Sequence, residues 1–190
     1  TAEPMVWLDG LDMHMVRLFE ASFREGWIND EPIEPTKPEF DALHRYGANL
    51  VPVEHTHTRK TSPIFSYPYD RTREALAALQ RADGPSPWLG YKMRYINPLT
   101  GGDAIPTIST FMQLLPKGFT TQPYRATDST VFVCVLGRGT TTVGGTAFDW
   151  EPHDIVVVPS WLKYTHAASE DAVLFSFSDR GPQELLGYCR

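Results

Sequence analysis

Five side chains between residues 118 and 169 have the chemistry to bind a ligand: an amide, two phenols, a guanidinium and an imidazole. They are Gln122, Tyr124, Arg125, Tyr164 and His166. In one interpretation the amide, the phenols and the imidazole satisfy one another as a hydrogen-bonded plug. In the other, Arg125 forks onto the acidic group of a small aromatic or acidic ligand, which the tyrosines flank.

A second candidate is the only His-x-His pair of the chain, His55 and His57. Alternate residues of a strand point the same way, so both rings could face one cation. However, no third histidine or carboxylate follows at a suitable spacing, and the flanking Thr-Arg-Lys-Thr is typical of an exposed loop. The solvated loop is therefore favoured over a metal site. Hydrolysis and group transfer are not indicated either, because the chain has no Gly-x-Ser-x-Gly elbow and no phosphate loop.

The stretch 118–169 has the pattern of a small β-barrel. Short apolar runs rich in β-branched residues alternate with Gly, Pro and Asp, which predicts an antiparallel sheet that closes on itself. Alternation of apolar and polar residues begins at Tyr91, another strand is predicted at 107–115, and strands are expected to continue to Asp179. The candidate side chains would then lie at the mouth of this barrel.

The residues before the barrel predict helices and an extended arm. An apolar run at 5–8 resembles a strand, and apolar residues then recur at helical spacing to about Gly26, which we interpret as core packing. Residues 29–39 hold three prolines among acidic residues, so this arm should run extended. The Ala- and Leu-rich segment 71–82 predicts the best helix of the chain, ended by Gly-Pro-Ser-Pro.

Composition limits the classes of function. With 190 residues, 42% of them hydrophobic, the chain can bury one good core, which favours one domain with a long arm. The net charge is -6 and no basic run exceeds Arg59-Lys60, so nucleic acid is not an expected partner. No apolar run approaches the roughly 20 residues that span a membrane. Only two cysteines occur, which favours a soluble protein of the reducing cytoplasm.

Several motifs together resemble a known family. YKMRYINPLTGG, PTIST, PKGFTTQPYRATDSTVF, GRGTTTVGG, FDWEPHDIVVVPSW and AVLFSFSD are similar to the second, C-terminal half of the gentisate 1,2-dioxygenases and of their salicylate and 1-hydroxy-2-naphthoate relatives. These enzymes are ring-cleaving bicupin oxidoreductases of aromatic compound degradation. The resemblance covers nearly the whole chain and implies a mainly β fold, a cupin (jelly-roll, double-stranded β-helix) barrel preceded by two N-terminal helices and the long extended arm.

The spacing of the cupin motif fixes where metal ligands would stand. With Gly118 as the first glycine of the motif, its two histidine positions and its glutamate position fall on Tyr124, Ala126 and Thr130, and the histidine after Pro159 falls on Tyr164. Each expected ligand is replaced, so no metal and no cofactor are expected in this chain. His166 stands two residues further on, and the resemblance implies for it a substrate-side or acid/base role.

The resemblance also predicts how the chain is organised. Residues 1–12 echo 170–179 in shape and resemble the closing strand of an upstream cupin, 13–88 form an arm or linker, and 89–190 form the barrel. In the resembled enzymes the upstream cupin holds the Fe(II). The chain would then be the structural, by itself inactive C-terminal cupin of a ring-cleaving dioxygenase, paired with its own N-terminal half or with a second copy in an oligomer. The alternative is a free-standing, metal-free cupin that serves binding or oligomerisation.

Overall fold

The chain divides into two compact units, Thr1–Thr36 and Lys37–Arg190. The computed structural model describes residues 4–26, 34, 37–54, 56 and 58–190. Most of the predicted arm at 29–39, together with His55 and His57, lies outside the described residues.

In the first unit the described helix is α1, Met13–Leu18. The prediction of a helix to about Gly26 was wrong: Glu20 has a positive φ of 50°, which ends the helical path. The predicted core packing is also absent from the described part of this unit, because Leu18 and Phe19 are 71% and 65% exposed. An apolar stripe without a partner cannot stabilise further turns. Residues 4–12 form no strand, and their assignment to an upstream barrel stays a prediction.

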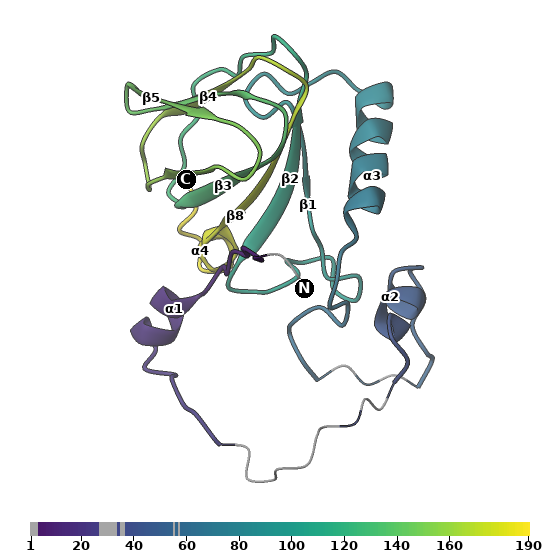
Figure 1. Ribbon diagram of the computed structural model, residues 1–190. Coiled ribbons are helices and arrows are strands. Elements are labelled where there is room, and N and C mark those ends of the chain that lie inside the picture. The colour runs from purple at the N-terminus through teal and green to yellow at the C-terminus, as the bar shows by residue number, and fades with distance from the viewer. Residues whose placement is uncertain (1–3, 27–33, 35–36, 55, 57) are drawn as a thin grey trace. The chain divides into compact units, whose positions relative to one another are not determined.

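The second unit holds two sheets and three helices among its described residues (Figure 1). In chain order its elements are α2 (Asp41–Tyr46), α3 (Tyr69–Ala82), β1 (Tyr91–Arg94), β2 (Ser109–Leu115), β3 (Thr130–Leu136), β4 (Gly139–Val143), β5 (Thr146–Trp150), β6 (Ile155–Val158), β7 (Tyr164–Ala168), β8 (Ala172–Ser178) and α4 (Arg180–Leu185). The predicted helix at 71–82 and the predicted strands from Tyr91 onward are confirmed. The short helices α2 and α4 were not predicted.

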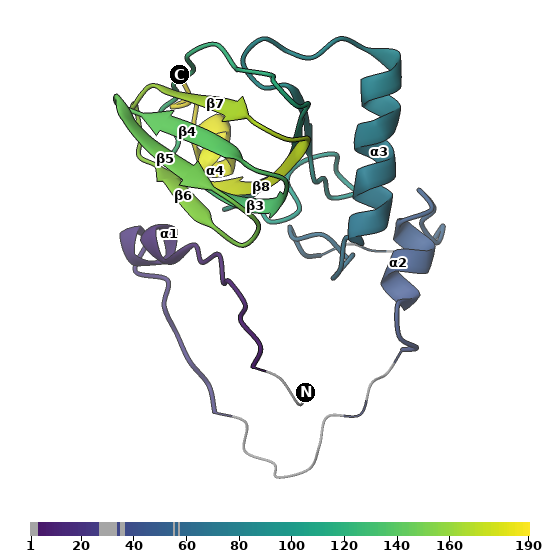
Figure 2. The ribbon, with the colours of Figure 1, turned by 45° about the horizontal axis from the view of Figure 1, so that its top comes forward.

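Both sheets are antiparallel, and together they give the mainly β fold that the sequence predicts. The larger sheet has the strand order β1-β2-β8-β3-β6 and the smaller one β5-β4-β7. Side chains from both sheets share one buried core, and Figure 2 shows the smaller sheet lying over β3 and β8. Among the described residues no ladder joins the two sheets, so the predicted closure of one sheet on itself is not seen. The segment between β2 and β3 instead pairs with β7 through isolated bridges, such as Tyr124 with Tyr164.

Alternation along the strands decides which residues enter this core. In β7 the buried residues are Tyr164, His166 and Ala168, whereas the residues between them are half-buried. In β3 the same period buries Phe132 and Cys134. Successive side chains of a strand point to opposite faces, so one face of each strand fills the space between the sheets.

The helix α3 covers the outer face of the larger sheet. Its fully buried Leu76 packs in a second cluster with Tyr91, Met112, Leu114 and Val173, which come from β1, β2 and β8. Figure 1 shows α3 running alongside β1 and β2. Strands β1 and β2 are therefore held from outside by α3, which fixes the direction of the β1 side chains that point inward.

Candidate functional site

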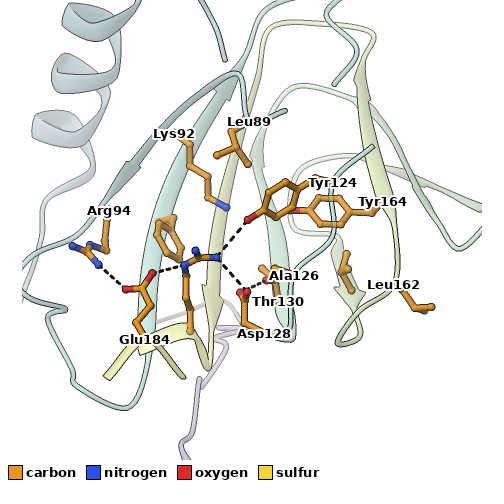
Figure 3. A pocket seen from close by; sticks show the side chains of 13 residues that line it. Leu89, Lys92, Arg94, Tyr124, Ala126, Asp128, Thr130, Leu162, Tyr164 and Glu184 are labelled. Atoms are coloured by element: carbon orange, nitrogen blue, oxygen red, sulfur yellow. Dashed lines mark hydrogen bonds and ion pairs between the residues drawn. The ribbon is translucent and has the colours of Figure 1, made fainter. Parts of the chain in front are cut away.

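A cavity of about 270 Å³ opens between the larger sheet, the loop before β3, the start of β7 and α4 (Figure 3). Its lining residues are Leu89, Lys92, Arg94, Phe111, Tyr124, Ala126, Asp128, Thr130, Val158, Leu162, Tyr164, Arg180 and Glu184. All four positions that the cupin spacing assigns to metal ligands lie in this lining. Of the five candidate side chains predicted at the mouth, Tyr124 and Tyr164 line this cavity.

Tyr124 and Tyr164 are brought together by backbone pairing. The backbone N–H of each donates to the carbonyl oxygen of the other, at 3.0 Å and 2.9 Å. Their rings lie edge to face with centroids 5.8 Å apart. Burial raises the pKa of Tyr164, with the neighbouring phenol of Tyr124 adding to the shift, so the Tyr164 hydroxyl stays protonated.

His166 lies deeper in the core and bonds to a different residue than predicted. Its Nδ1 is 2.8 Å from the hydroxyl oxygen of Thr141, which also accepts a hydrogen bond from Trp150 Nε1 at 2.9 Å. Its ring packs on Phe132, with centroids 4.7 Å apart. Burial, and then the positive charge of Lys92, lower the pKa of His166 to about 3. The imidazole is therefore neutral at physiological pH, and its Nε2 has no hydrogen-bond partner among the described residues.

The other two predicted residues point away from the cavity. Gln122 is exposed, and its backbone N–H donates to Pro87 O at 2.7 Å. Arg125 is also exposed and stacks over the ring of Trp161, 4.3 Å from its centroid. Arg125 points outward because it lies between two residues that line the cavity. Alternation does not hold at Gln122, where Pro123 follows and the segment pairs only through isolated bridges. The plug predicted from all four polar side chains does not form.

Five charged residues that the sequence patterns did not point to also line the cavity: Lys92, Arg94, Asp128, Arg180 and Glu184. Arg180 Nε donates to Glu184 Oε1 at 2.6 Å, and Arg180 Nη1 lies 3.3 Å from Asp128 Oδ1 and 3.5 Å from Tyr124 Oη. Burial acts to lower the pKa of Arg180, but these partners outweigh it and the pKa is raised. Arg94 Nη1 reaches Glu184 Oε2 at 3.4 Å.

Lys92 extends from β1 into the cavity, where Figure 3 shows its amine on the side of Tyr124. The amine lies 4.6 Å from the ring centroid of Phe111 and 5.4 Å from that of Phe132. Burial lowers its pKa to about 8, against the opposing charge of Asp128 and with a contribution from Arg180. The alternation at 91–95 predicts that Lys92 lies on the opposite face of the strand from Tyr91. It does not predict which of the two faces points inward.

The donor atoms at the predicted metal positions are two phenols and one hydroxyl, since Ala126 offers none. Across the described residues, no cluster of three or more His, Cys, Asp or Glu side chains has an arrangement that could hold a metal ion. None of the helices in the described part is both long and apolar enough to cross a membrane. Both cysteines, Cys134 and Cys189, are free.

Comparison with known proteins identifies relatives along nearly the entire chain. It is 54% identical over 188 residues to gentisate 1,2 dioxygenase 1 of Aquipseudomonas alcaligenes, an alignment of 99% of this chain and 54% of that protein. It is 39% identical over 193 residues to 5-aminosalicylate 1,2-dioxygenase of Comamonas sp, covering 100% of this chain and 50% of that protein. The chain spans about half the length of the curated relatives it matches. No protein-family model matches it.

The fold comparison agrees with the sequence comparison. The salicylate 1,2-dioxygenase of Pseudaminobacter salicylatoxidans superposes with a TM-score of 0.81 at 27% identity, over 94% of this chain and 52% of that one. The predicted cupin fold is thereby confirmed. Over the half that it spans, the chain belongs to the gentisate and salicylate 1,2-dioxygenase family of cupin proteins.

Proposed function

We propose that this chain is the C-terminal cupin half of a ring-cleaving Fe(II) dioxygenase that acts on a gentisate- or salicylate-like aromatic acid. One observation carries the proposal: 99% of the chain aligns at 54% identity with only 54% of a gentisate 1,2 dioxygenase. The iron and the aromatic substrate are assigned to the other half. This chain then provides the scaffold against which that half packs, in the reducing cytoplasm.

The donor set of the cavity does not suit Fe(II), which prefers imidazole and carboxylate ligands with open positions for substrate and O₂. The phenol of Tyr164 stays protonated, because burial raises its pKa. The phenol of Tyr124 lies 3.5 Å from the guanidinium of Arg180, whose positive charge repels a metal cation. Asp128 is paired with the same guanidinium. We therefore assign no catalytic step to this cavity through iron, and regard it as a degenerate metal site.

The apolar side chains of residues 4–12 support the pairing with a second half. Val6 and Trp7 are 96% and 74% exposed, and Met5 is 68% exposed. Apolar side chains that are contiguous in sequence and left in water mark surfaces that another chain or domain covers. In the proposal these residues close the upstream cupin, which belongs either to the same polypeptide or to a second copy.

The test is to purify the chain alone and co-expressed with the N-terminal half of the Aquipseudomonas alcaligenes relative, and to measure bound iron and O₂ uptake with gentisate, salicylate and 5-aminosalicylate. The chain alone should carry no stoichiometric iron and consume no O₂. The pair should co-purify, bind iron and turn over one of these acids, and the N-terminal half alone is the control. Stoichiometric iron with turnover by the chain alone would contradict its structural role.

The alternative, a free-standing cupin that binds a ligand or mediates assembly, is favoured by one observation: the cavity remains open and is lined by the amine of the half-buried Lys92. The same experiment separates the two proposals. A chain that remains a clean monomer in light scattering and does not pair with the N-terminal half supports the binding module and contradicts the dioxygenase half.

A further inference from the structure

Of the basic side chains that line the cavity, the two arginines form ion pairs, whereas Lys92 forms none with the residues that the structure describes. Arg180 pairs with Asp128 and Glu184, and Arg94 pairs with Glu184 at 3.4 Å and with Asp103 at 3.9 Å. Lys92 takes part in none of the ion pairs found in the described part of the chain. The carboxylates that line the cavity are thus bound by the arginines. Among the described residues no carboxylate lies within ion-pair distance of the Lys92 ammonium, although the charge of Asp128 acts on it from further away.

Two aromatic rings lie beside the ammonium of Lys92, a residue that is half-buried. Its nitrogen lies 4.6 Å from the ring centroid of Phe111 and 5.4 Å from that of Phe132. A ring face stabilises a cation only in part, by about 0.5 to 2 kcal/mol. A charge that is partly removed from water loses solvation, and a partner charge or hydrogen bond offsets that loss. A carboxylate that enters the cavity would supply that missing partner.

The other walls of the cavity suit a flat apolar body. Phe111, Tyr124 and Tyr164 contribute aromatic faces and edges, while Leu89 and Leu162 contribute aliphatic groups. The volume of about 270 Å³ lies just below the roughly 300–1,000 Å³ of sites that hold drug-sized ligands. The cavity therefore has room for a molecule of one ring rather than several.

We propose that this cavity binds a small aromatic monocarboxylate, with the ring between the tyrosines and Phe111 and the carboxylate on the ammonium of Lys92. The site is independent of the iron assigned to the other half of the enzyme, and it replaces Arg125 as the predicted anion-binding group. Tyr124 can add a hydrogen bond, because its oxygen accepts from Arg180 and its proton remains free to donate.

The test is calorimetric titration of the chain with benzoate and with benzamide, which has the same shape without the charge. Benzoate should bind at least tenfold more tightly than benzamide, and acetate should bind weakly because it lacks the ring. In Lys92→Met the preference for benzoate should vanish, whereas Lys117→Met, which removes an exposed lysine, should bind like the parent chain. Removing a half-buried charge that has no ion-pair partner among the described residues should leave the fold intact, and the thermal unfolding of Lys92→Met checks this directly.

Raising the pH gives an independent readout, because only the protonated amine can pair with a carboxylate. The other ionisable side chains that line the cavity or adjoin Lys92 are Arg94, Tyr124, Asp128, Tyr164, His166, Arg180 and Glu184. Burial lowers the pKa of Lys92 to about 8, so benzoate affinity should fall roughly thirtyfold between pH 7 and 9.5, while benzamide affinity should not change.

Two results would overturn the inference: equal affinity for benzoate and benzamide, or a Lys92→Met chain that binds benzoate like the parent. A failure to bind benzoate at 10 mM, about ten times the upper end of the roughly 1 μM to 1 mM range that is typical of small-molecule substrates, would also overturn it. None of these results bears on the dioxygenase proposal, which is judged by iron and O₂ uptake in the paired halves. Conversely, a failed pairing leaves the benzoate titration unaffected.

Discussion

The buried imidazole of His166 makes the stability of this fold depend on pH below neutrality. Its pKa in the folded chain is lowered to about 3 by burial and by Lys92, whereas in the unfolded chain it should be near the ordinary value of roughly 6.5. Between these two values the unfolded state binds the proton and the folded state does not. The stabilising contribution is therefore fully present above pH 6.5 and is lost as the pH falls toward 3.

The size of the loss follows from the two pKa values. Below the unfolded pKa, the free energy of unfolding falls by about 1.4 kcal/mol per pH unit for one such group. From pH 7.5 to pH 5 the sum is about 2 kcal/mol. This figure changes little if the folded pKa is a unit higher or lower, because the folded imidazole is neutral throughout that range.

Urea unfolding followed by tryptophan fluorescence measures this effect, because Trp150 is 4% exposed and hydrogen-bonds to the same Thr141 hydroxyl as His166. The control is His166→Gln, which can still bond to Thr141 but does not titrate. Since the other histidines and the carboxylates are common to both proteins, the difference in their free energies of unfolding isolates His166. That difference should move by about 2 kcal/mol between pH 7.5 and 5. An identical pH dependence in both proteins, or an NMR titration of His166 near pH 6.5, would refute the reasoning.

Two further predictions concern packing and backbone. Leu174→Ala, in the shared core at 1% exposure, should lower the free energy of unfolding by about 2–5 kcal/mol in urea, whereas Leu185→Ala, at 82% exposure, should change it by less than about 0.5 kcal/mol. Gly137→Ala should lower the melting temperature more than Gly145→Ala does. Both glycines have a positive φ, but of the two only Gly137 would bring its new Cβ against a backbone oxygen, that of Asp171, at 2.3 Å. Equal melting temperatures of the two variants would contradict the role of this close approach.

The strands were predictable from the sequence because their pattern is local. Alternation from Tyr91, the Ala- and Leu-rich segment at 71–82 and the Gly and Pro punctuation each act within a few residues. The helix predicted to reach Gly26 failed for the opposite reason. Its apolar stripe needed a surface to pack against, and in the first unit those side chains are exposed. Periodicity identifies an amphipathic face but does not supply the partner of that face.

The candidate site was predictable in part. The spacing from Gly118 located Tyr124, Ala126, Thr130 and Tyr164, and all four line the cavity. Arg125 does not face the cavity, although the sequence predicts it as an anion-binding group. It alternates with Tyr124 and Ala126, which do face the cavity, so its side chain lies on the other face of the chain. The sequence predicts that His166 forms hydrogen bonds at the mouth of the barrel. In the structure it bonds to Thr141, because β4 and β7 pair with these two residues opposite each other. That register is a tertiary property.

The sequence by itself determined that strands follow one another from Tyr91 to about Asp179 and that the ligand positions of the motif carry no imidazole or carboxylate. Only the tertiary structure decided which charges face that mouth. Lys92 on β1 and Arg180 on α4 are far apart in the chain, and they line one cavity because β1 pairs with β2, β2 pairs with β8, and α4 follows β8 directly. Alternation tells which residues share a face of a strand, but the pairing of the strands and the second sheet that covers them decide which face is inside.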